Sequence, residues 1–421
     1  MLIKIRISII LAVTSLIVNA QNTVIKAGHF FDAQSGKMLN DQFIVIKNGK
    51  IKEVGANIKL KKSDKVIDLS DSWVLPGLID CHVHITTNLP YRKGDWNDEY
   101  ITESNALRAI RGSVVARQFL DNGFTTIKDV GNDGNYATAD VIKSIKKGWT
   151  KGPTIIYTGK IIAPYGGQTW GVNPENEHFW DLQFIDADTP NEIKKAIRKN
   201  IYYGATSIKM VTGDNGIYNI EDIKAAVFEA KKYNIKVTVH VMGGLAATNA
   251  ISGGIVAIEH GFELNNEQLE LMKNKEIFLV GTDFSFENWY GYGLDSIASK
   301  KKTDMIVDRL KRAYKIGTPI AFGSDIIINL PGLNRVQSSL KVLETWKAAE
   351  IPTSYILKSM TLNAAELLGI DKERGLLKPT YYADIIAVKS NPLINIEAIK
   401  TVHFVMKEGE IIRNDKKRII D

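Results

Sequence analysis

Two histidines stand two residues apart at the end of a short apolar run, LIDCHVH, at positions 78–84. Alternate residues of a strand project from the same face, so His82 and His84 should point together while Val83 points away. Two neutral imidazoles on one face form a chelate for a borderline metal such as Zn²⁺. The spacing alone is a weak indication, because a single buried histidine is more often a hydrogen-bonded residue of the core.

Further ionisable residues lie within or at the end of later apolar runs: Lys209 in SIKMV, His240 in KVTVHV, His260 in IVAIEH and Asp325 in PIAFGSD. When parallel strands close into a barrel, their carboxyl ends share one mouth, where active sites lie. We therefore predict that these side chains and the two histidines meet at one metal site. Lys209 needs its own explanation, because an ammonium in an apolar strand must reach water, find a partner or lose its charge.

The runs that carry these residues alternate with helical stretches such as IEDIKAAVFEAKKYN. Counting LIDCHVH first, eight short runs rich in β-branched residues follow one another, the others being TTIKDV, TIIYTG, SIKMV, KVTVHV, IVAIEH, IFLVG and PIAFGSD. That count predicts an α/β fold with a (β/α)8 TIM barrel over residues 78–375.

The two ends of the chain have a different pattern, with short apolar runs separated by Gly, Asn and Ser. Asn48-Gly49 is a typical hairpin turn between two such runs. We expect residues 21–77 and 376–421 to build one small β-sandwich domain together, from both termini.

Residues 1–20 have the pattern of a signal peptide, with Lys4 and Arg6 ahead of an apolar stretch and a small residue, Ala20, at the expected cleavage point. The alternative is a transmembrane anchor, but the apolar stretch is shorter than the roughly 20 residues of a span. We expect an exported protein, periplasmic or secreted, that is free of the membrane after cleavage. Cys81 is the only cysteine, so a large core rather than an intramolecular disulfide must stabilise the fold.

The composition is that of a globular protein, since 44% of the 421 residues are hydrophobic and 24% are charged. The net charge of +7 is spread along the chain, without a basic stripe interleaved with aromatic residues. We therefore expect no nucleic-acid partner. The expected partner is a small molecule, and a homo-oligomer is left open.

The segments LPGLIDCHVHI, SIKMV, VTVHV, AIEHG and AFGSD, in this order, resemble the metal-dependent amidohydrolase superfamily. The imidazolonepropionase-like and Xaa-Pro dipeptidase-like amidohydrolases are the most similar. The resemblance covers nearly all of the mature chain and includes the closing segment GLLKPTYYADIIAVKSNPL. Together the motifs are specific for the superfamily, although none of them is specific alone.

The resemblance implies a centre with two divalent metal ions, expected to be Zn²⁺. His82, His84 and Asp325 would hold the more buried ion, and His240 and His260 the more exposed one. Lys209 would react with CO2 to give a carbamate whose oxygens bridge the two ions. This agrees with the charges, because nearby dications disfavour an ammonium and favour an anionic ligand.

The implied reaction is hydrolysis of a carbon–nitrogen (amide) bond by a metal-bridging hydroxide. Asp325 would be the catalytic residue that takes the proton of the hydroxide and passes it to the departing amine. Dipeptides or N-acyl amino acids are plausible substrates. Asp129, at the end of TTIKDV, is interpreted as a supporting residue and not as a ligand.

Two alternatives remain open. One is a mononuclear imidazolonepropionase or deaminase type that acts on cyclic carbon–nitrogen bonds, but those enzymes generally lack the lysine found at position 209. The other, from a different class, is a non-catalytic interaction protein with the amidohydrolase fold. Such proteins typically lose metal ligands, whereas all six positions are filled here.

The loops after the third and seventh runs, at 163–182 and 283–296, are rich in aromatic residues and suit a ligand with an apolar body. The predicted substrate contacts are Gln168, His178, Tyr218, Trp289 and Tyr290. Dipeptidase-like relatives often have His where this chain has Gln168, and a Gly-Gly pair where it has 213–216, Gly-Asp-Asn-Gly. These departures argue against a strict prolidase.

Overall fold

The computed structural model describes residues 21–92, 102–131, 134–168, 173–214, 216–415 and 419–420. The predicted signal peptide, residues 1–20, lies outside the described residues. Within the described ranges, no helix combines the length and the apolar character needed to span a membrane.

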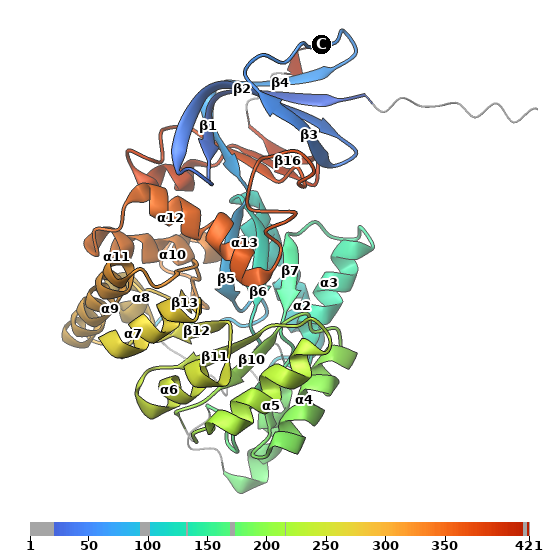
Figure 1. Cartoon of the computed structure of the whole chain (residues 1–421). Coiled ribbons are helices and arrows are strands. Elements are labelled where there is room, and N and C mark those ends of the chain that lie inside the picture. Colours follow the sequence, from blue (N-terminus) through green and yellow to red (C-terminus); the bar gives the residue numbers. More distant parts are fainter. Residues whose placement is uncertain are drawn as a thin grey trace, which may run out of the picture.

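Strands from both ends of the chain belong to the same sheet (Figure 1). They are β1 (Thr23–Asp32), β2 (Lys37–Lys47), β3 (Lys50–Gly55), β4 (Lys65–Pro76), β14 (Ile385–Val388), β15 (Phe404–Lys407), β16 (Glu410–Asn414) and β17 (Ile419–Ile420). Their order is β16-β15-β14-β4-β1-β2-β3, with β17 paired to β4. The expected β-rich domain built from both termini is therefore present, and its described strands are linked in one continuous hydrogen-bonded sheet.

The register of this sheet follows from local turn chemistry and from burial. Asn48 and Gly49 join β2 to β3 with positive φ angles of 52° and 77°, as a tight hairpin turn requires. β4 is the strand that connects the two ends of the chain, because it pairs with β1 on one side and with β14 on the other. A separate hydrophobic core lies within this sheet and includes Ile25, Ile44 and Phe404.

A second group of strands is parallel and carries the predicted site residues. One sheet contains β5 (Leu78–Val83), β6 (Phe124–Asp129) and β7 (Thr154–Tyr157). The other contains β8 (Ile161–Ala163), β10 (Ile208–Val211), β11 (Val237–Val241), β12 (Ala257–His260) and β13 (Phe278–Val280), with β9 (Phe184–Asp186) beside β8. These strands are short, and β5, β6, β10, β11 and β12 are buried on both faces, as expected for a parallel sheet covered by helices.

The third predicted run, TIIYTG, contains only β7, and a second strand, β8, follows it directly. Gly159 has a φ of 71° between β7 and β8, and this turn lets the two strands pair with different neighbours. β7 pairs with β6, whereas β8 pairs with β10 and with β9, a strand that the sequence did not predict.

The eighth predicted run, at 319–325, is not a regular strand but joins the two groups. Leu279 of β13 donates its N–H to the Pro319 carbonyl, and Ala321 donates to Leu279 in return. On the other side, Cys81 of β5 donates to the Phe322 carbonyl. These bonds connect β13 to β5 in the order predicted for a (β/α)8 barrel.

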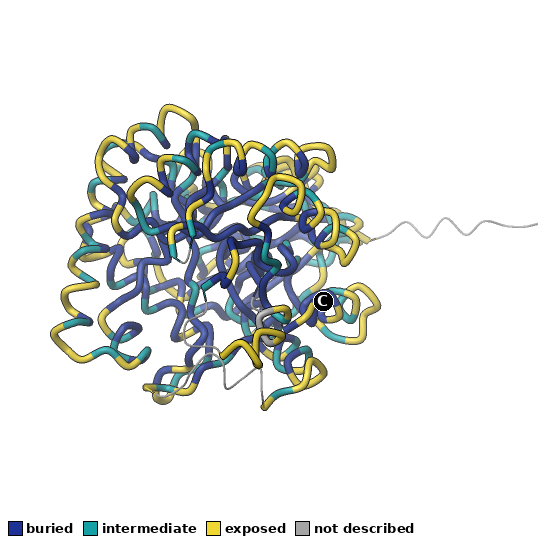
Figure 2. Tube along the Cα trace, turned by 90° about the horizontal axis from the view of Figure 1, so that it is seen from below, coloured by how far each residue is buried: buried dark blue, intermediate teal, exposed yellow. Residues whose placement is uncertain are grey.

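Helices surround the parallel strands in Figure 1. They are α2 (Asn105–Asp121), α3 (Ala137–Lys146), α4 (Pro190–Tyr202), α5 (Ile220–Lys231), α6 (Gly244–Gly253), α7 (Asn266–Asn274), α8 (Phe286–Gly291), α9 (Ser296–Ile316), α10 (Arg335–Ser339), α11 (Leu343–Ala348), α12 (Thr353–Ser359) and α13 (Leu362–Leu368), with 3-10 turns η1 (Pro174–Leu182), η2 (Leu340–Val342) and η3 (Ile396–Thr401). Several begin with a capping box, for example Thr189 with Glu192 at α4. Figure 2 shows the buried interior and the exposed outer turns that result.

Candidate metal centre

One cavity of about 170 Å³ brings together all the side chains predicted as metal ligands. Its lining residues are His82, His84, Ile161, Gln168, Lys209, His240, Met242, His260, Phe262, Phe284, Trp289 and Asp325. The ligand candidates come from β5 and the residue directly after it, from β10, β11 and β12, and from the eighth run. The cavity therefore has a polar floor of imidazole, amine and carboxylate groups beside an apolar wall.

His82 and His84 are each held by a hydrogen bond at Nδ1. His84 Nδ1 lies 2.7 Å from the carbonyl oxygen of Gly131, and His82 Nδ1 lies 2.8 Å from Oε2 of Glu259. Because a carbonyl and an ionised carboxylate only accept, both Nδ1 atoms carry the proton. The Nε2 lone pairs of both rings are left available.

Both of these Nε2 atoms face Asp325. Oδ1 of Asp325 lies 3.4 Å from Nε2 of His82 and 3.3 Å from Nε2 of His84. His82 Nε2 is buried and has no hydrogen-bond partner among the described residues. Lone pairs thus face a carboxylate oxygen without a proton between them, which is unfavourable unless a cation lies there. This donor set fits a divalent metal ion.

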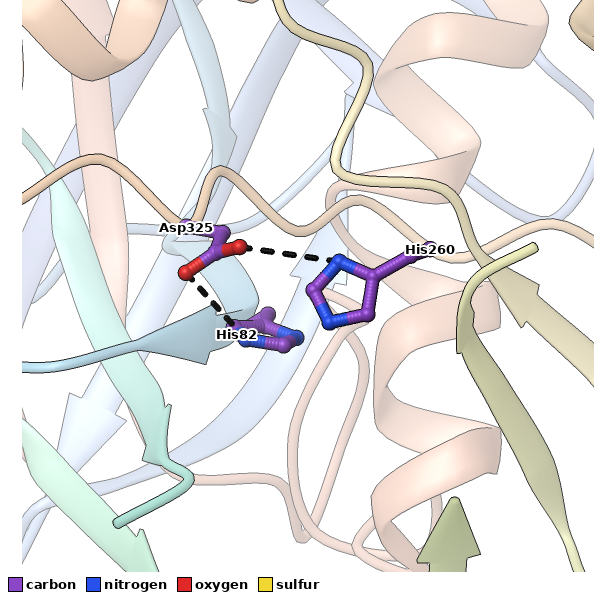
Figure 3. A group of neighbouring side chains, drawn as sticks. All are labelled: His82, His260 and Asp325. Atoms are coloured by element: carbon purple, nitrogen blue, oxygen red, sulfur yellow. Dashed lines mark ion pairs between the residues drawn. The ribbon is translucent and has the colours of Figure 1, made fainter. Parts of the chain in front are cut away.

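His260 completes the group beside His82 and faces the other carboxylate oxygen of Asp325 (Figure 3). Its Nδ1 lies 3.6 Å from Oδ2 of Asp325 and 2.8 Å from the hydroxyl of Thr282. Ligand atoms of His82, His260 and Asp325 all lie within 4.8 Å of one another. The three residues could therefore share one metal ion.

The backbone is strained at this end of the strands. His260 and Asp325 have positive φ angles of 69° and 55°, which residues other than glycine rarely adopt. Glu259 points into the interior toward His82, so regular alternation would turn His260 outward. The left-handed conformation of His260 allows both neighbours to point toward the centre.

The second pair of histidines is close and uncharged. The rings of His240 and His260 lie 4.2 Å apart between centroids. Burial lowers the pKa of His240, and burial together with His240 lowers the pKa of His260 well below its usual range. Neutral imidazole is the form that binds metal, so both rings are suitable ligands.

Lys209 is buried beside them, with a side chain that is 2% exposed. Among the described residues it makes no hydrogen bond or ion pair within bonding distance. Burial lowers the pKa of its amine from the ordinary 10.5 to about 8, despite the opposing charge of Glu259. Lys209 is thus buried without a close partner among the described residues, and its ammonium form is disfavoured.

Two of the predicted substrate contacts line the cavity. Gln168 Nε2 lies 3.0 Å from Oδ2 of Asp214 and 3.1 Å from Nε2 of His240. Trp289, on α8, lies in the apolar wall with Phe262. The loop residues 169–172, next to Gln168, lie outside the described residues.

The other three predicted substrate contacts do not line the cavity. His178 is exposed in η1, and Tyr218 is buried with its hydroxyl donating to the Ala187 carbonyl at 2.7 Å. The Tyr290 ring stacks on Phe286 and packs under the Arg92 guanidinium. The sequence predicts that these residues lie near the cavity, but it does not determine the direction of their side chains.

The sequence interpretation missed several residues that support the ligands. Glu259 binds His82, and Lys128 Nζ lies 2.8 Å from Glu259 Oε1. Oδ1 of Asp80 accepts the backbone N–H of His82 at 3.0 Å, and burial raises the pKa of Asp80 to about 7. Asp80 precedes His82 by two residues on the same strand face, and this spacing is the signal that could have indicated it.

Asp129 supports the loops behind the ligands, as its position predicted. Its Oδ2 accepts the N–H of Ile85 at 2.9 Å, and its Oδ1 accepts the N–H of Gly131 at 3.3 Å. Gly131 in turn provides the carbonyl that holds His84. Asp129 therefore acts on the site through the backbone.

Comparisons with known proteins identify the family of this chain. The family model described as "Amidohydrolase family" matches residues 73–412. Ochratoxinase of Aspergillus niger is 27% identical over 436 residues, covering 94% of this chain and 87% of that protein. Its crystal structure superposes with a TM-score of 0.81 and 26% identity, over 94% of this chain and 96% of that one.

Two further proteins show the range of similar chains. A crystal structure of a Xaa-Pro dipeptidase with methionine bound in its active site has a TM-score of 0.82 and 27% identity, over 94% of this chain and all of that one. A 5-methylthioadenosine/S-adenosylhomocysteine deaminase of Pyrococcus furiosus is 23% identical over 382 residues, covering 82% of this chain and 81% of that protein.

The family match spans most of the chain and contains every residue that lines the cavity. Its limits lie within β4 and β16, so it includes the parallel strands and parts of the sheet built from both ends. The chain therefore belongs to the amidohydrolase family, and it is a hydrolase that acts on carbon–nitrogen bonds.

Proposed function

We propose that this protein is a binuclear, metal-dependent hydrolase that cleaves the amide bond of small molecules, namely dipeptides or N-acyl amino acids. The observation that carries the proposal is the position of Lys209, which is buried, has no close partner in the described part of the chain and shares a cavity with four histidines and Asp325. The similarity to a Xaa-Pro dipeptidase supports a peptide-like substrate. We also interpret the linked parallel strands as a (β/α)8 barrel, whose carboxyl-terminal mouth is the usual place for such a site.

The residues fit two divalent ions, with Zn²⁺ as our expectation. His82, His84 and Asp325 would hold one ion, since two Nε2 lone pairs and one carboxylate oxygen converge without a proton between them. His240 and His260, both kept neutral by burial, would hold the other. When bound, such ions supply a Lewis acid for the substrate carbonyl and lower the pKa of water.

Lys209 would serve both ions as a carbamate formed with CO2. A carbamate forms from the neutral amine, and burial favours that form by lowering the pKa of Lys209 to about 8. The product carries a negative charge and two oxygens, which the neutral imidazoles of the site lack.

Asp325 is the residue that we propose to move protons. Its Oδ1 lies 3.4 Å from Nε2 of His82 and 3.3 Å from Nε2 of His84, and a cation bound between them would keep the carboxylate ionised and able to accept a proton. It would take a proton from the attacking water and give it to the departing amine. The apolar wall formed by Met242, Phe262 and Trp289 would exclude bulk water and bind an apolar part of the substrate.

A mononuclear enzyme of the deaminase type is the second candidate. It is favoured by the compact group of His82, His260 and Asp325, which could hold a single ion, and by the similarity to a deaminase. The two candidates differ in the use of Lys209, which a mononuclear centre of this kind does not need.

Metal analysis and a substrate screen test the proposal together. Protein purified without chelators should contain close to two ions per chain and should hydrolyse members of a dipeptide library with varied carboxyl-terminal residues. A content of one ion per chain would support the mononuclear candidate. Two ions without turnover of any dipeptide or N-acyl amino acid would overturn the proposed substrate class.

A further inference from the structure

A line of buried polar contacts extends behind His82, on the side away from Asp325. Oε2 of Glu259 lies 2.8 Å from His82 Nδ1, and Oε1 accepts a hydrogen bond from Lys128 Nζ at 2.8 Å. Lys128 also donates to the hydroxyl of Thr238 at 2.9 Å. His82 and Lys128 are each 1% exposed and Glu259 is fully buried. The contacts are thus shielded from solvent and well formed.

These residues come from strands that are not neighbours. Lys128 lies on β6 and Glu259 on β12, which belong to different sheets, so their ion pair crosses the interior. Burying such a pair is costly, and apolar residues of similar volume often give equal or greater stability. Stability is therefore a poor explanation for the pair, whereas its contact with His82 suggests a role at the site.

We propose that Glu259 and Lys128 are positioning residues of the metal centre. Glu259 fixes the tautomer of His82 with the proton on Nδ1 and orients the ring so that Nε2 faces Asp325. Lys128 holds the carboxylate of Glu259 in place and balances its charge. The inference rests on the metal centre of the proposed function, and it assigns to Glu259 and Lys128 a role beyond that function.

His82 and His84 are supported differently. His84 donates to a neutral backbone carbonyl, that of Gly131, whereas His82 donates to a carboxylate. A carboxylate behind an imidazole raises the basicity of the ring, so His82 becomes the stronger donor to a metal. Loss of Glu259 should therefore weaken the bond between His82 and a metal without changing the support of His84.

Two matched double variants isolate this hydrogen bond. Lys128→Met with Glu259→Gln removes both charges but keeps an oxygen that can accept from His82. Lys128→Met with Glu259→Leu has a similar volume and removes the acceptor as well. The readouts are the affinity of the metal-free protein for Zn²⁺, measured by competition with a chromophoric chelator, and the visible spectrum of the Co²⁺-loaded protein.

We expect the Gln variant to bind Zn²⁺ within about tenfold of the wild type and the Leu variant to bind it about 10–100-fold more weakly, the usual range for such supporting residues. The Co²⁺ spectrum should change in the Leu variant only. Equal affinities and equal spectra in the two variants would overturn the proposal.

A distant buried ion pair controls for a general loss of stability. Arg374 pairs with Asp384 beside the sheet built from both ends, and both side chains are largely buried. Arg374→Met with Asp384→Asn should leave the Zn²⁺ affinity unchanged. An equal loss of affinity in this control would show that the effect is not specific to Glu259 and would count against the proposal.

A further test uses the wild-type protein without metal and needs no substitution of Glu259 or Lys128. In the metal-free protein labelled with ¹⁵N-histidine, the His82 signals, assigned by their loss in His82→Gln, should show a protonated Nδ1 and an unprotonated Nε2. The opposite tautomer would overturn the inference. If this tautomer is found but the protein binds no metal, the proposed function fails while the role of Glu259 in orienting His82 stands.

Discussion

Lys209 shows how burial can change the chemistry of a residue. Its strand neighbours, Ile208 and Met210, are fully buried, and so is nearly all of the lysine side chain. A lysine in this environment loses the hydration that stabilises its ammonium, and the pKa falls to about 8. The same burial places the amine beside the imidazoles of the cavity, where a neutral amine can be modified or can bind a metal.

Substitution of Lys209 by alanine should remove both metal and activity. We expect the metal content to fall below two ions per chain and kcat/KM to fall by more than about 100-fold, since loss of a mere supporting residue already costs about 10–100-fold. Short carboxylic acids should restore part of the activity by replacing the carbamate. Metal analysis and a hydrolysis assay with and without acetate or propionate measure both effects.

The control for this prediction is Lys195→Ala, on the exposed face of α4. It should keep the wild-type metal content and rate. Full activity in Lys209→Ala would show that Lys209 does not bridge two ions.

At the scale of elements, helices α4 and α5 pack against each other and against β8 and β11, the two neighbours of the strand β10 that carries Lys209. Glu229 of α5 is buried and holds Arg198 of α4 at 2.7 Å and Lys232 at 2.7 Å. These two cations lower the pKa of Glu229 to about 2. The carboxylate therefore stabilises the fold above its unfolded pKa, near 4.5, and this contribution is lost as the pH falls toward 2.

Glu229→Gln should lower the melting temperature at pH 7. The free energy of unfolding should fall by no more than about 1 kcal/mol, because Arg198 and Lys232 are largely exposed. The difference from the wild type should narrow as the pH falls below about 4.5. Thermal melts over a pH series measure it, with Glu221→Gln, whose side chain is 76% exposed, as control. A difference that grows in acid would contradict the assigned ion pairs.

The contact between α5 and α6 depends on a glycine. A Cβ atom added at Gly253 would lie 2.2 Å from Cγ2 of Ile223, a fully buried side chain. Gly253→Ala should therefore destabilise the protein by about 1–3 kcal/mol, the usual cost of overpacking. Urea unfolding measures this, and Ser252→Ala, one residue earlier and half-buried, should have little effect. Equal stability of the two variants would mean that the helices can separate without cost.

At the scale of the whole molecule, the site is joined to the sheet built from both ends. β4 ends at Pro76 in that sheet, and β5 begins at Leu78 and leads to His82. The first described strand starts at Thr23, after the predicted cleavage point. The described strands therefore all lie within the expected mature chain.

We propose export on the basis of the predicted signal peptide. The mature protein in its native host should begin at Gln21, and mass spectrometry of the intact secreted or periplasmic protein measures this. A variant with Leu11→Lys, which interrupts the apolar stretch, should stay in the cytoplasm with its first residues retained. Wild-type protein that keeps Met1 and remains in the cytoplasm would contradict the proposal.

The sequence alone was enough to predict which side chains meet in the cavity. His82, His84, His240 and His260 each close an apolar run, and strand periodicity with the shared mouth of parallel strands predicts that they meet. These rules are local and repeat from strand to strand, so they can be applied without coordinates. The hairpin at Asn48-Gly49 was predictable for the same reason, because the turn depends on two adjacent residues.

The tertiary structure decided what lies behind and around those ligands. Glu259 and Lys128 are 131 residues apart in sequence and meet only because the strands enclose a common interior. Tyr218 turns its hydroxyl to Ala187 and away from the cavity, a direction set by packing. Periodicity gives the face of a strand on which a residue lies, but partners across an interior depend on how all the strands pack together.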